Sequence, residues 1–201
     1  MSRTQRLQPS PKNKMLTMRA AMRDQADNPL IPIGDDQIKQ ALPGITIVSY
    51  PELVRGLPWD AEGRFIVLYV SESTPALQSG HWCACFKRSG FITWHDSYGL
   101  KPDEPLDWLS LKERAALGQT RKVLTELLAR EGLPVVYSPY KLQSPQHKIA
   151  TCGKHAVIRL LRMDLSVDAY ARWLSSVNPN TDLAVEFLWD VHREAKAHPA
   201  R

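Results

Sequence analysis

The stretch HWCACFKRSGFITWHD, residues 81–96, places two apolar segments on either side of a short polar turn. The segments at 81–86 and 91–96 are rich in aromatic and other apolar side chains, which favour strands. Between them, KRSG at 87–90 supplies the glycine and the polar residues of a tight turn. The stretch therefore predicts a β-hairpin.

The register of this hairpin decides which side chains of its two strands meet. If the turn is centred on Arg88 and Ser89, His81 lies directly opposite Asp96. Directly opposed residues have Cβ atoms about 4.5 to 5.5 Å apart on one face of the sheet. A carboxylate there can accept the imidazole N–H, fix the histidine tautomer and stabilise the charged ring. A register shifted by two residues would instead place Tyr98 opposite His81, so this prediction depends on the turn.

The remaining apolar patterns predict strands and helices in a mixed order. Residues 64–70, RFIVLYV, form a nearly continuous apolar run, which is typical of a strand buried on both faces. Helical spacing of apolar side chains between about 106 and 131 ends at Gly132. We also expect strands at 45–50 and 133–138, helices at 35–42, 166–176 and 181–196, and a further helix after Cys152. The predicted fold class is α+β, with a central mixed β-sheet packed by helices.

Length and charge divide the chain into two predicted parts. Its 201 residues suit one domain with a full core and a short extension. The first 23 residues hold six basic side chains and no acidic one, whereas the other 20 basic side chains are matched by all 21 acidic ones. We therefore expect a flexible basic arm at 1–28 and a folded domain at 29–201. The arm either meets nucleic acid or an acidic surface or is merely solvated, and it holds no aromatic ring to stack on bases.

The stretch QHKIATCGKHAVIRLLRM, residues 146–163, supplies a candidate nucleophile. Cys152 precedes an apolar run at helical spacing, which predicts that its sulfur lies at the N-terminus of a helix. Free N–H groups and the macrodipole stabilise a thiolate there, and a nearby imidazolium lowers its pKa further. Local N–H groups and an amide from Gln143 or Gln146 could stabilise an oxyanion. A buried structural cysteine is the simpler interpretation of the stretch alone, but the histidine and carboxylate of the hairpin favour catalysis.

The cysteines allow a second interpretation, a zinc site. His81, Cys83 and Cys85 alternate along one predicted strand, and Cys152 could complete a tetrahedral shell. Alternate side chains of a straight strand are about 6.5 to 7 Å apart, too far for one ion. We therefore expect no metal, and we interpret Cys83 and Cys85 as buried residues that pack beneath the helix after Cys152. Three cysteines with this spacing also argue against a disulfide framework and indicate a reducing compartment.

Three short blocks resemble one family of enzymes. GHW at 80–82, HDSYG at 95–99 and TCGKH at 151–155, with a glutamine-containing loop before the last, resemble the adenain-like cysteine proteases. This is the viral branch of the clan that also holds the SUMO-specific proteases. The resemblance covers the order of elements over roughly residues 30–190, and it implies a central sheet with the nucleophile at the start of a buried helix.

The resemblance assigns roles to residues of this chain. It implies His81 as the general base, Asp96 as its orienting partner and Cys152 as the nucleophile. The oxyanion glutamine of the family usually stands six or seven residues before the cysteine, which is the position of Gln146. The letters LQS around Gln143 look more like the viral glutamine block, with a lengthened loop after it. Gln143 is therefore the preferred assignment, and Gln146 stays an alternative.

The function implied by the resemblance is that of a cysteine endopeptidase, without cofactor, that processes viral structural or polyprotein precursors. A non-catalytic capsid or scaffold module with a protease fold and a protease that removes a ubiquitin-like modifier are the alternatives. The expected partners are protein substrates and, through the basic arm, nucleic acid or a capsid protein. Because the sequence shows no signal peptide and no long apolar segment, we expect no membrane contact and a location in the host cytoplasm or nucleus and the virion.

Overall fold

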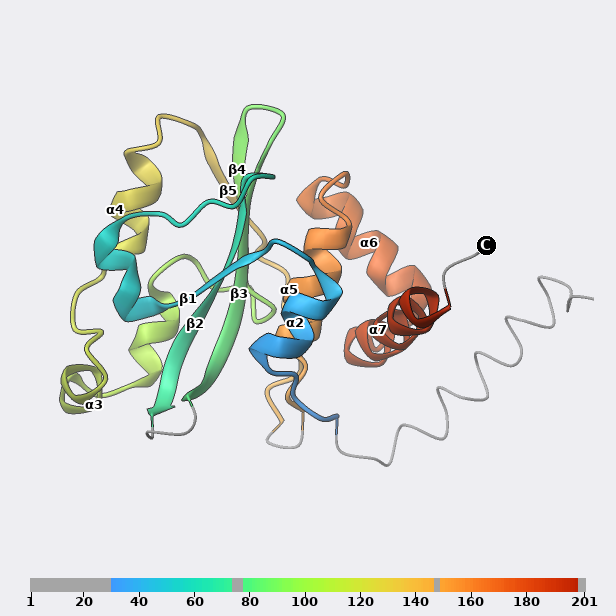
Figure 1. Cartoon of the computed structure of the whole chain (residues 1–201), viewed down its shortest axis with the longest axis horizontal. Coiled ribbons are helices and arrows are strands. Elements are labelled where there is room, and N and C mark those ends of the chain that lie inside the picture. The colour runs from blue at the N-terminus through green and yellow to red at the C-terminus, as the bar shows by residue number, and fades with distance from the viewer. Residues whose placement is uncertain (1–29, 74–77, 147–148, 199–201) are drawn as a thin grey trace, which may run out of the picture.

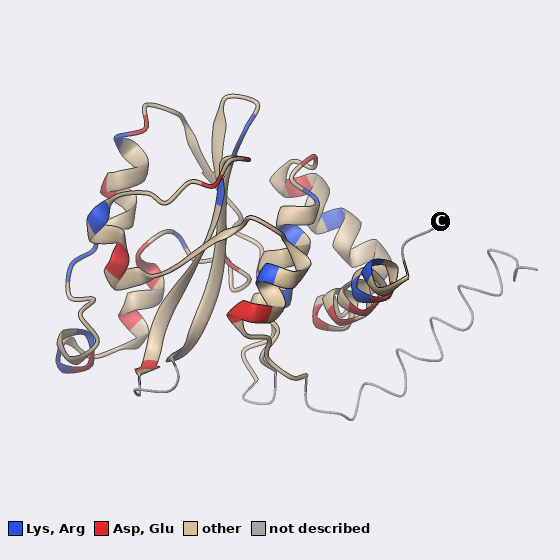
Figure 2. Cartoon of the chain, viewed as in Figure 1, with Lys and Arg blue, Asp and Glu red and all other residues tan. Residues whose placement is uncertain are grey.

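The structure is a computed structural model that describes residues 30–73, 78–146 and 149–198 (Figure 1). The predicted basic arm at 1–28 lies outside these ranges, so the division of the chain near residue 28 stays a prediction. In the described part, basic and acidic residues are interspersed along the ribbon (Figure 2). None of the described helices is long and apolar enough to cross a membrane.

A five-stranded mixed sheet forms the centre of the fold. Its strands lie side by side in sequence order: β1 (Thr46–Ser49), β2 (Arg64–Ser73), β3 (Gln78–Arg88), β4 (Phe91–His95) and β5 (Val135–Tyr137). The two outer pairs of strands are parallel and the two inner pairs antiparallel. As its apolar sequence predicts, β2 is buried on both faces from Arg64 to Val70. The predicted α+β class with a central mixed sheet is confirmed.

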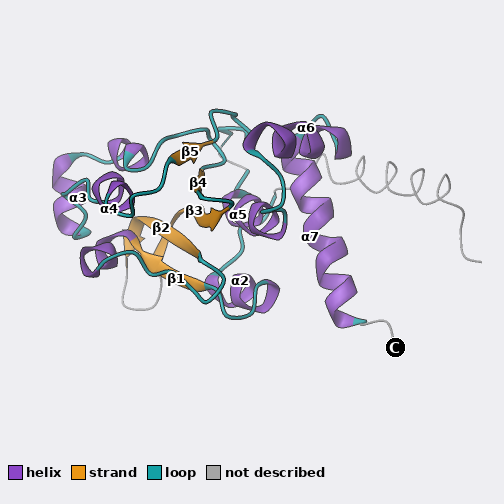
Figure 3. Cartoon of the chain, turned by 90° about the horizontal axis from the view of Figure 1, so that it is seen from above, coloured by secondary structure: helices purple, strands orange, loops and turns teal. Residues whose placement is uncertain are grey.

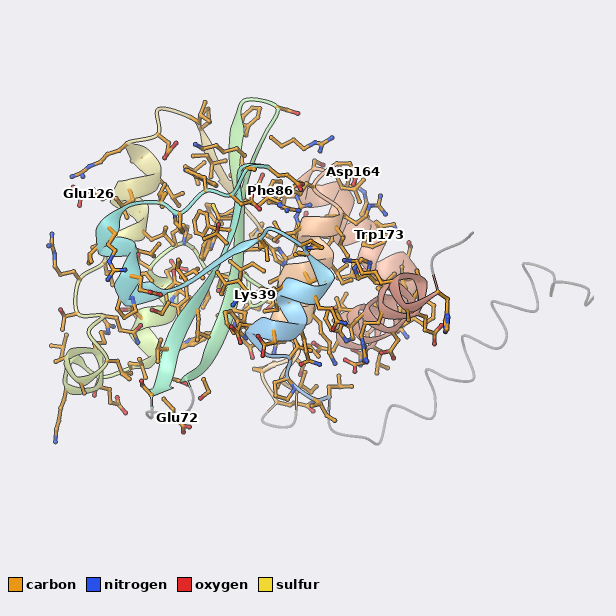
Figure 4. The ribbon with its side chains drawn as sticks, in the orientation of Figure 1. Lys39, Glu72, Phe86, Glu126, Asp164 and Trp173 are labelled. Atoms are coloured by element: carbon orange, nitrogen blue, oxygen red, sulfur yellow. The ribbon has the colours of Figure 1, made fainter. Side chains whose placement is uncertain are left out.

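Helices cover both faces of this sheet (Figure 1 and Figure 3). On the first face lie the 3₁₀ helices η1 (Tyr50–Arg55) and η2 (Glu104–Trp108) and the helices α3 (Leu111–Ala116) and α4 (Leu124–Ala129). On the second face lie α2 (Asp35–Ala41) and α5 (Cys152–Leu161), with α6 (Val167–Val177) and α7 (Thr181–Ala197) packed outside α5. Figure 4 shows Phe86 of β3 toward the α5 side and Glu126 of α4 on the opposite side of the sheet.

The two hairpin cysteines lie on the face that we did not expect. Because alternate residues of a strand point to opposite faces, Cys83 and Cys85 join the apolar cluster of the first face, with Leu124 of α4. Ala84 and Phe86, with the partly buried Trp82, are the β3 residues that pack with α5. The prediction that the two cysteines pack beneath the helix after Cys152 is therefore wrong.

The helical region predicted between about 106 and 131 is divided into three short helices, η2, α3 and α4. Gly118 follows α3 with a positive φ of 69°, a conformation that glycine adopts without strain. α4 then starts anew because the buried Asp103 carboxylate accepts the N–H groups of Leu124 (3.0 Å) and Thr125 (2.9 Å). A side chain from outside the segment thus decides where α4 begins.

Candidate active site

Cys152 is the first residue of α5, the most deeply buried of the described helices, with every residue from Cys152 to Leu160 buried. Gly153 allows the start of this helix to pack closely. A Cβ atom at Gly153 would lie 2.7 Å from Ile33 Cγ1 and 3.2 Å from Trp82 Cδ1. The space beside Gly153 is thus filled by the protein's own side chains, which hold the start of α5 against β3.

The hairpin register differs by two residues from the predicted one. Arg88 pairs with Phe91, so the turn consists of Ser89 and Gly90 rather than being centred on Arg88 and Ser89. Both turn residues have positive φ, 51° and 79°. Two-residue hairpin loops of type I′ require positive φ at both central positions, which favours glycine. The glycine therefore belongs to the centre of the turn, and the prediction placed that centre one residue too early.

The two hairpin residues expected to interact still meet. In the observed register Tyr98 lies beside His81, with ring centroids 5.1 Å apart. His81 reaches Asp96 diagonally, as aromatic side chains can, and its Nε2 atom lies 3.0 Å from Asp96 Oδ2. The N–H of Tyr98 donates to Asp96 Oδ1 at 2.7 Å, which holds the carboxylate in place. The contact therefore forms through a different geometry from the one predicted.

Charge and hydrogen bonds shift the pKa values of His81 and Cys152 in opposite directions. Burial opposes the charged form of His81, but the negative charge beside it and its hydrogen bonds with Asp96 and Cys152 hold its pKa well above 6.5. Because burial keeps Cys83 a thiol, the Asp96 carboxylate supplies this charge. Burial also opposes the Cys152 thiolate, yet the hydrogen bond and charge of His81 and two backbone N–H groups lower the pKa below 9.0. Both shifts favour a thiolate–imidazolium pair near neutral pH.

Gln143 is held through its main chain and its side chain. Its N–H donates to Ser97 O at 2.8 Å, and the Ser97 hydroxyl donates to Gln143 Oε1 at 2.7 Å. This second bond orients the amide, so Nε2 points toward the loop before Cys152 and donates to Ile149 O at 3.2 Å. Gln146, in contrast, lies exposed on that loop. The structure thus places Gln143, and not Gln146, beside the other predicted residues.

A cavity of about 260 Å³ gives access to these groups. Cys152, His81 and Gln143 line it together, while the fully buried Asp96 lies behind His81. The ring of Trp108 from η2 lies 5.1 Å from the His81 ring and forms part of the wall. A small substrate segment in this cavity would meet a thiol, an imidazole and an amide donor at once.

Cys83 brings a second sulfur to the His81–Asp96 pair. Its thiol donates to Asp96 Oδ2 at 3.2 Å, and the ligand-type atoms of His81, Cys83 and Asp96 all lie within 4.8 Å of one another. The spacing along the strand, which argued against zinc, does not separate this trio. In this structure burial and the Asp96 charge raise the pKa of Cys83, so its thiol keeps its proton and donates to the carboxylate. The trio is better described as a hydrogen-bond network around Asp96.

Two residues that the sequence analysis missed hold the predicted ones in place. Ser97 binds Gln143, and its place directly after Asp96 is the only sequence signal for it. Asp182 of α7 accepts the Ser144 N–H and the Thr151 hydroxyl, next to Gln143 and Cys152. Its contact with Thr151 spans 31 residues, so no local pattern could have indicated it.

Comparison with known proteins finds a viral relative and distant structural likenesses, one of which is described below. No protein-family model matches the chain. The chain is 29% identical over 136 residues to an uncharacterized protein, V9, of Sputnik virophage. The aligned region covers 65% of this chain and 75% of V9. Among solved structures the chain resembles the SUMO protease Ulp1 with its catalytic cysteine oxidized to a sulfenic acid. That likeness has a TM-score of 0.37 and 12% identity and covers 94% of this chain and 98% of the other. It is too distant to say anything about the site.

Proposed function

We propose that this chain is a cysteine endopeptidase whose nucleophile is Cys152. His81 is its general acid and base, Asp96 orients the imidazole, and Gln143 donates to the oxyanion. One observation carries the proposal: a cysteine at the start of a buried helix lines one cavity with an imidazole that hydrogen-bonds it, and a buried carboxylate lies 3.0 Å from that imidazole. The lowered pKa of Cys152 suits a nucleophile, and the raised pKa of His81 suits the proton donor beside it.

The reaction runs in two steps through a thioester. The Cys152 thiolate attacks the peptide carbonyl carbon, a C–S bond forms, and the carbonyl electron pair moves to the oxygen. Gln143 Nε2 has a second N–H besides the one given to Ile149 O, and this N–H and that of Cys152 stabilise the oxyanion. As the C–N bond breaks, His81 gives its proton to the leaving amine. His81 then deprotonates a water that hydrolyses the thioester and frees the thiolate.

The setting we propose is viral. The relationship to V9 of Sputnik virophage supports a viral origin, and the resemblance of the HDSYG and TCGKH blocks to adenain-like proteases supports processing of viral structural or polyprotein precursors. Such an enzyme would act in the host cytoplasm or nucleus and in the virion. The products of the reaction distinguish this proposal from its two alternatives, a capsid module without activity and a protease for a ubiquitin-like modifier.

The basic arm would add a second partner. Six basic side chains within the first 23 residues can bind phosphates with little sequence preference and strong salt dependence. Labelled DNA is titrated with the full chain and with a chain that starts at residue 29, at two salt concentrations. Binding that needs the arm and weakens with salt supports nucleic acid as the partner. Equal behaviour of the two chains favours docking on a capsid protein or plain solvation.

Alkylation and peptide digestion test the enzyme itself. Iodoacetamide labelling near neutral pH, followed by peptide mapping, is expected to modify Cys152 well before Cys83 or Cys85, because only Cys152 has a lowered pKa. Preferential labelling of the other two would contradict the nucleophile assignment. A peptide library digested by the wild type, with the Cys152→Ala variant as control, then reports cleavage by mass spectrometry. A reactive Cys152 without any cleaved peptide would favour the non-catalytic module.

A further inference from the structure

We propose that Asp182, at the start of α7, is a positioning residue that sets the distance between the two oxyanion donors, Gln143 and the N–H of Cys152. The inference rests on the proposed function and adds a residue to it. Asp182 itself touches neither the cavity nor the thiol; it acts through Ser144 and Thr151, which adjoin the two donors.

One buried carboxylate joins the two segments that carry the donors. Asp182 is 2% exposed, its Oδ2 accepts the N–H of Ser144 at 2.8 Å, and its Oδ1 accepts the Thr151 hydroxyl at 2.5 Å. Ser144 directly follows Gln143, and Thr151 directly precedes Cys152. Oδ1 also lies 3.3 Å from His155 Nε2, one turn into α5. Charge-assisted hydrogen bonds of this kind are short and strong, so the carboxylate fixes the two segments relative to each other.

The start of α7 is itself built to hold the glutamine loop. The Asn180 side chain caps the helix by accepting the N–H groups of Asp182 (3.1 Å) and Leu183 (3.3 Å). The Thr181 hydroxyl donates to the carbonyl of Leu142, while Asp182 accepts from Ser144. Two successive α7 residues therefore bind the main chain on either side of Gln143.

The Thr151 hydroxyl shows that this contact competes with an ordinary helix cap. Thr151 stands at the N-cap position of α5, where a threonine side chain normally accepts an N–H of the first turn. Here the hydroxyl donates to Asp182 instead. The tie to α7 thus replaces the local cap and makes the position of Cys152 depend on α7.

A second link between α5 and α7 provides a matched control. Lys154 Nζ binds both carboxylate oxygens of Glu186, at 2.6 and 2.5 Å, one turn further along α7. This ion pair joins the same two helices but does not bind the loop around Gln143. Glu186→Gln therefore makes the same chemical change as Asp182→Asn, a carboxylate to an amide, without altering the bonds to Ser144 and Thr151.

Two small probes separate positioning from mere stability. p-Nitrophenyl acetate acylates a thiolate through an oxyanion: a C–S bond forms, the ester C–O bond breaks, and nitrophenolate leaves with the electron pair. Iodoacetamide alkylates the same thiolate by displacing iodide, so no oxyanion forms. In Asp182→Asn we expect acylation of Cys152 to slow roughly tenfold or more, while its alkylation stays within about twofold of the wild type. Glu186→Gln should leave the ratio of the two rates unchanged.

The outcomes separate this inference from the proposed function. The role of Asp182 would be overturned if Asp182→Asn slowed acylation and alkylation equally. It would also be overturned if Glu186→Gln changed the ratio of the two rates as much as Asp182→Asn does. If Asp182→Asn does not fold, Thr151→Val removes the hydrogen bond between Thr151 and Asp182 and should lower the ratio of the acylation rate to the alkylation rate. Thr151→Ser should restore that ratio. An unchanged ratio in Thr151→Val overturns the inference. A wild type whose Cys152 reacts with neither probe defeats the proposed function, and the positioning role with it.

Discussion

Two buried thiols lie near the same imidazole–carboxylate pair, and their pKa values are shifted in opposite directions. Cys83, in the middle of β3, donates to Asp96, and burial and the carboxylate charge raise its pKa. Cys152, at the start of α5, is also buried, yet His81 and two backbone N–H groups lower its pKa. Burial opposes both thiolates and His81 favours both, so the difference comes from the other partners: the Asp96 carboxylate beside Cys83 and two backbone N–H groups beside Cys152.

The secondary structure around each cysteine explains why those partners differ. In the middle of a strand the backbone groups are paired with the neighbouring strands, so Cys83 finds only side chains beside it. The first turn of a helix leaves its N–H groups without partners in the helix, and that of Gly153 binds the Cys152 sulfur together with the Trp82 N–H from β3. A reactive cysteine in this fold therefore requires a helix start, and a buried cysteine in the sheet is expected to be inert.

The largest expected effect comes from removing the reactive thiol. Cys152→Ala should lower kcat on the order of 10⁶-fold, because the covalent route disappears, with little effect on folding. The measurement is cleavage of a peptide identified from the library digestion, together with a thermal unfolding curve. Cys85→Ala serves as the control, since Cys85 is buried and pairs with Trp94, and it is not part of the His81, Cys83 and Asp96 trio. A comparable loss of kcat in Cys85→Ala would contradict the view that Cys152 is reactive and the cysteines of the sheet are inert.

Removing the charge of Asp96 should reduce the difference between the pKa values of Cys83 and Cys152 without deleting a thiol. Asp96→Asn keeps the shape of the side chain, and we expect kcat to fall on the order of 10³- to 10⁴-fold. Without the carboxylate the pKa of His81 falls, so less imidazolium is present and the pKa of Cys152 rises. Between pH 6.5 and 9.0, the ordinary values of the two groups, Cys152 alkylation should slow and should recover as the pH rises. An alkylation profile identical to that of the wild type would refute the role of Asp96.

The two glutamines test the oxyanion side of the Cys152 site. Gln143→Ala should lower kcat on the order of a hundredfold, because one donor to the developing charge is lost. The alkylation rate of Cys152 should not change, since that reaction forms no oxyanion. Gln146→Ala is the matched control and should behave as the wild type, because Gln146 is exposed on the loop. A large loss in Gln146→Ala and none in Gln143→Ala would reverse the assignment.

The smallest effect is expected at Cys83. Cys83→Ala removes one donor to Asp96, but the carboxylate keeps His81 and the N–H of Tyr98. We therefore expect kcat to change by less than about threefold and the free energy of unfolding to fall by about 1 kcal/mol. Chemical denaturation of Cys83→Ala and Cys83→Ser measures this, because a serine hydroxyl can replace the lost donor. A loss of activity as large as that of Asp96→Asn would mean that Cys83 takes part in the reaction.

Much of the fold follows from local sequence patterns. The strands and the helix starting at Cys152 were predicted because apolar periodicity reports directly which faces of an element are buried. The segment between about 106 and 131 was harder, since Asp103 starts α4 from outside it. The predicted site residues His81, Gln143 and Cys152 do line one cavity, whereas their roles remain a proposal.

What the sequence alone determined is the set of chemical groups and the elements that carry them: a histidine and an aspartate on a hairpin, and a cysteine at a helix start. What only the tertiary structure decided is how they meet. The turn at Ser89 and Gly90 shifts the register, so His81 reaches Asp96 diagonally. Asp182 joins the loops of Gln143 and Cys152 from α7. Contacts between side chains far apart in the chain leave no periodic pattern in the sequence, because they depend on how whole elements pack.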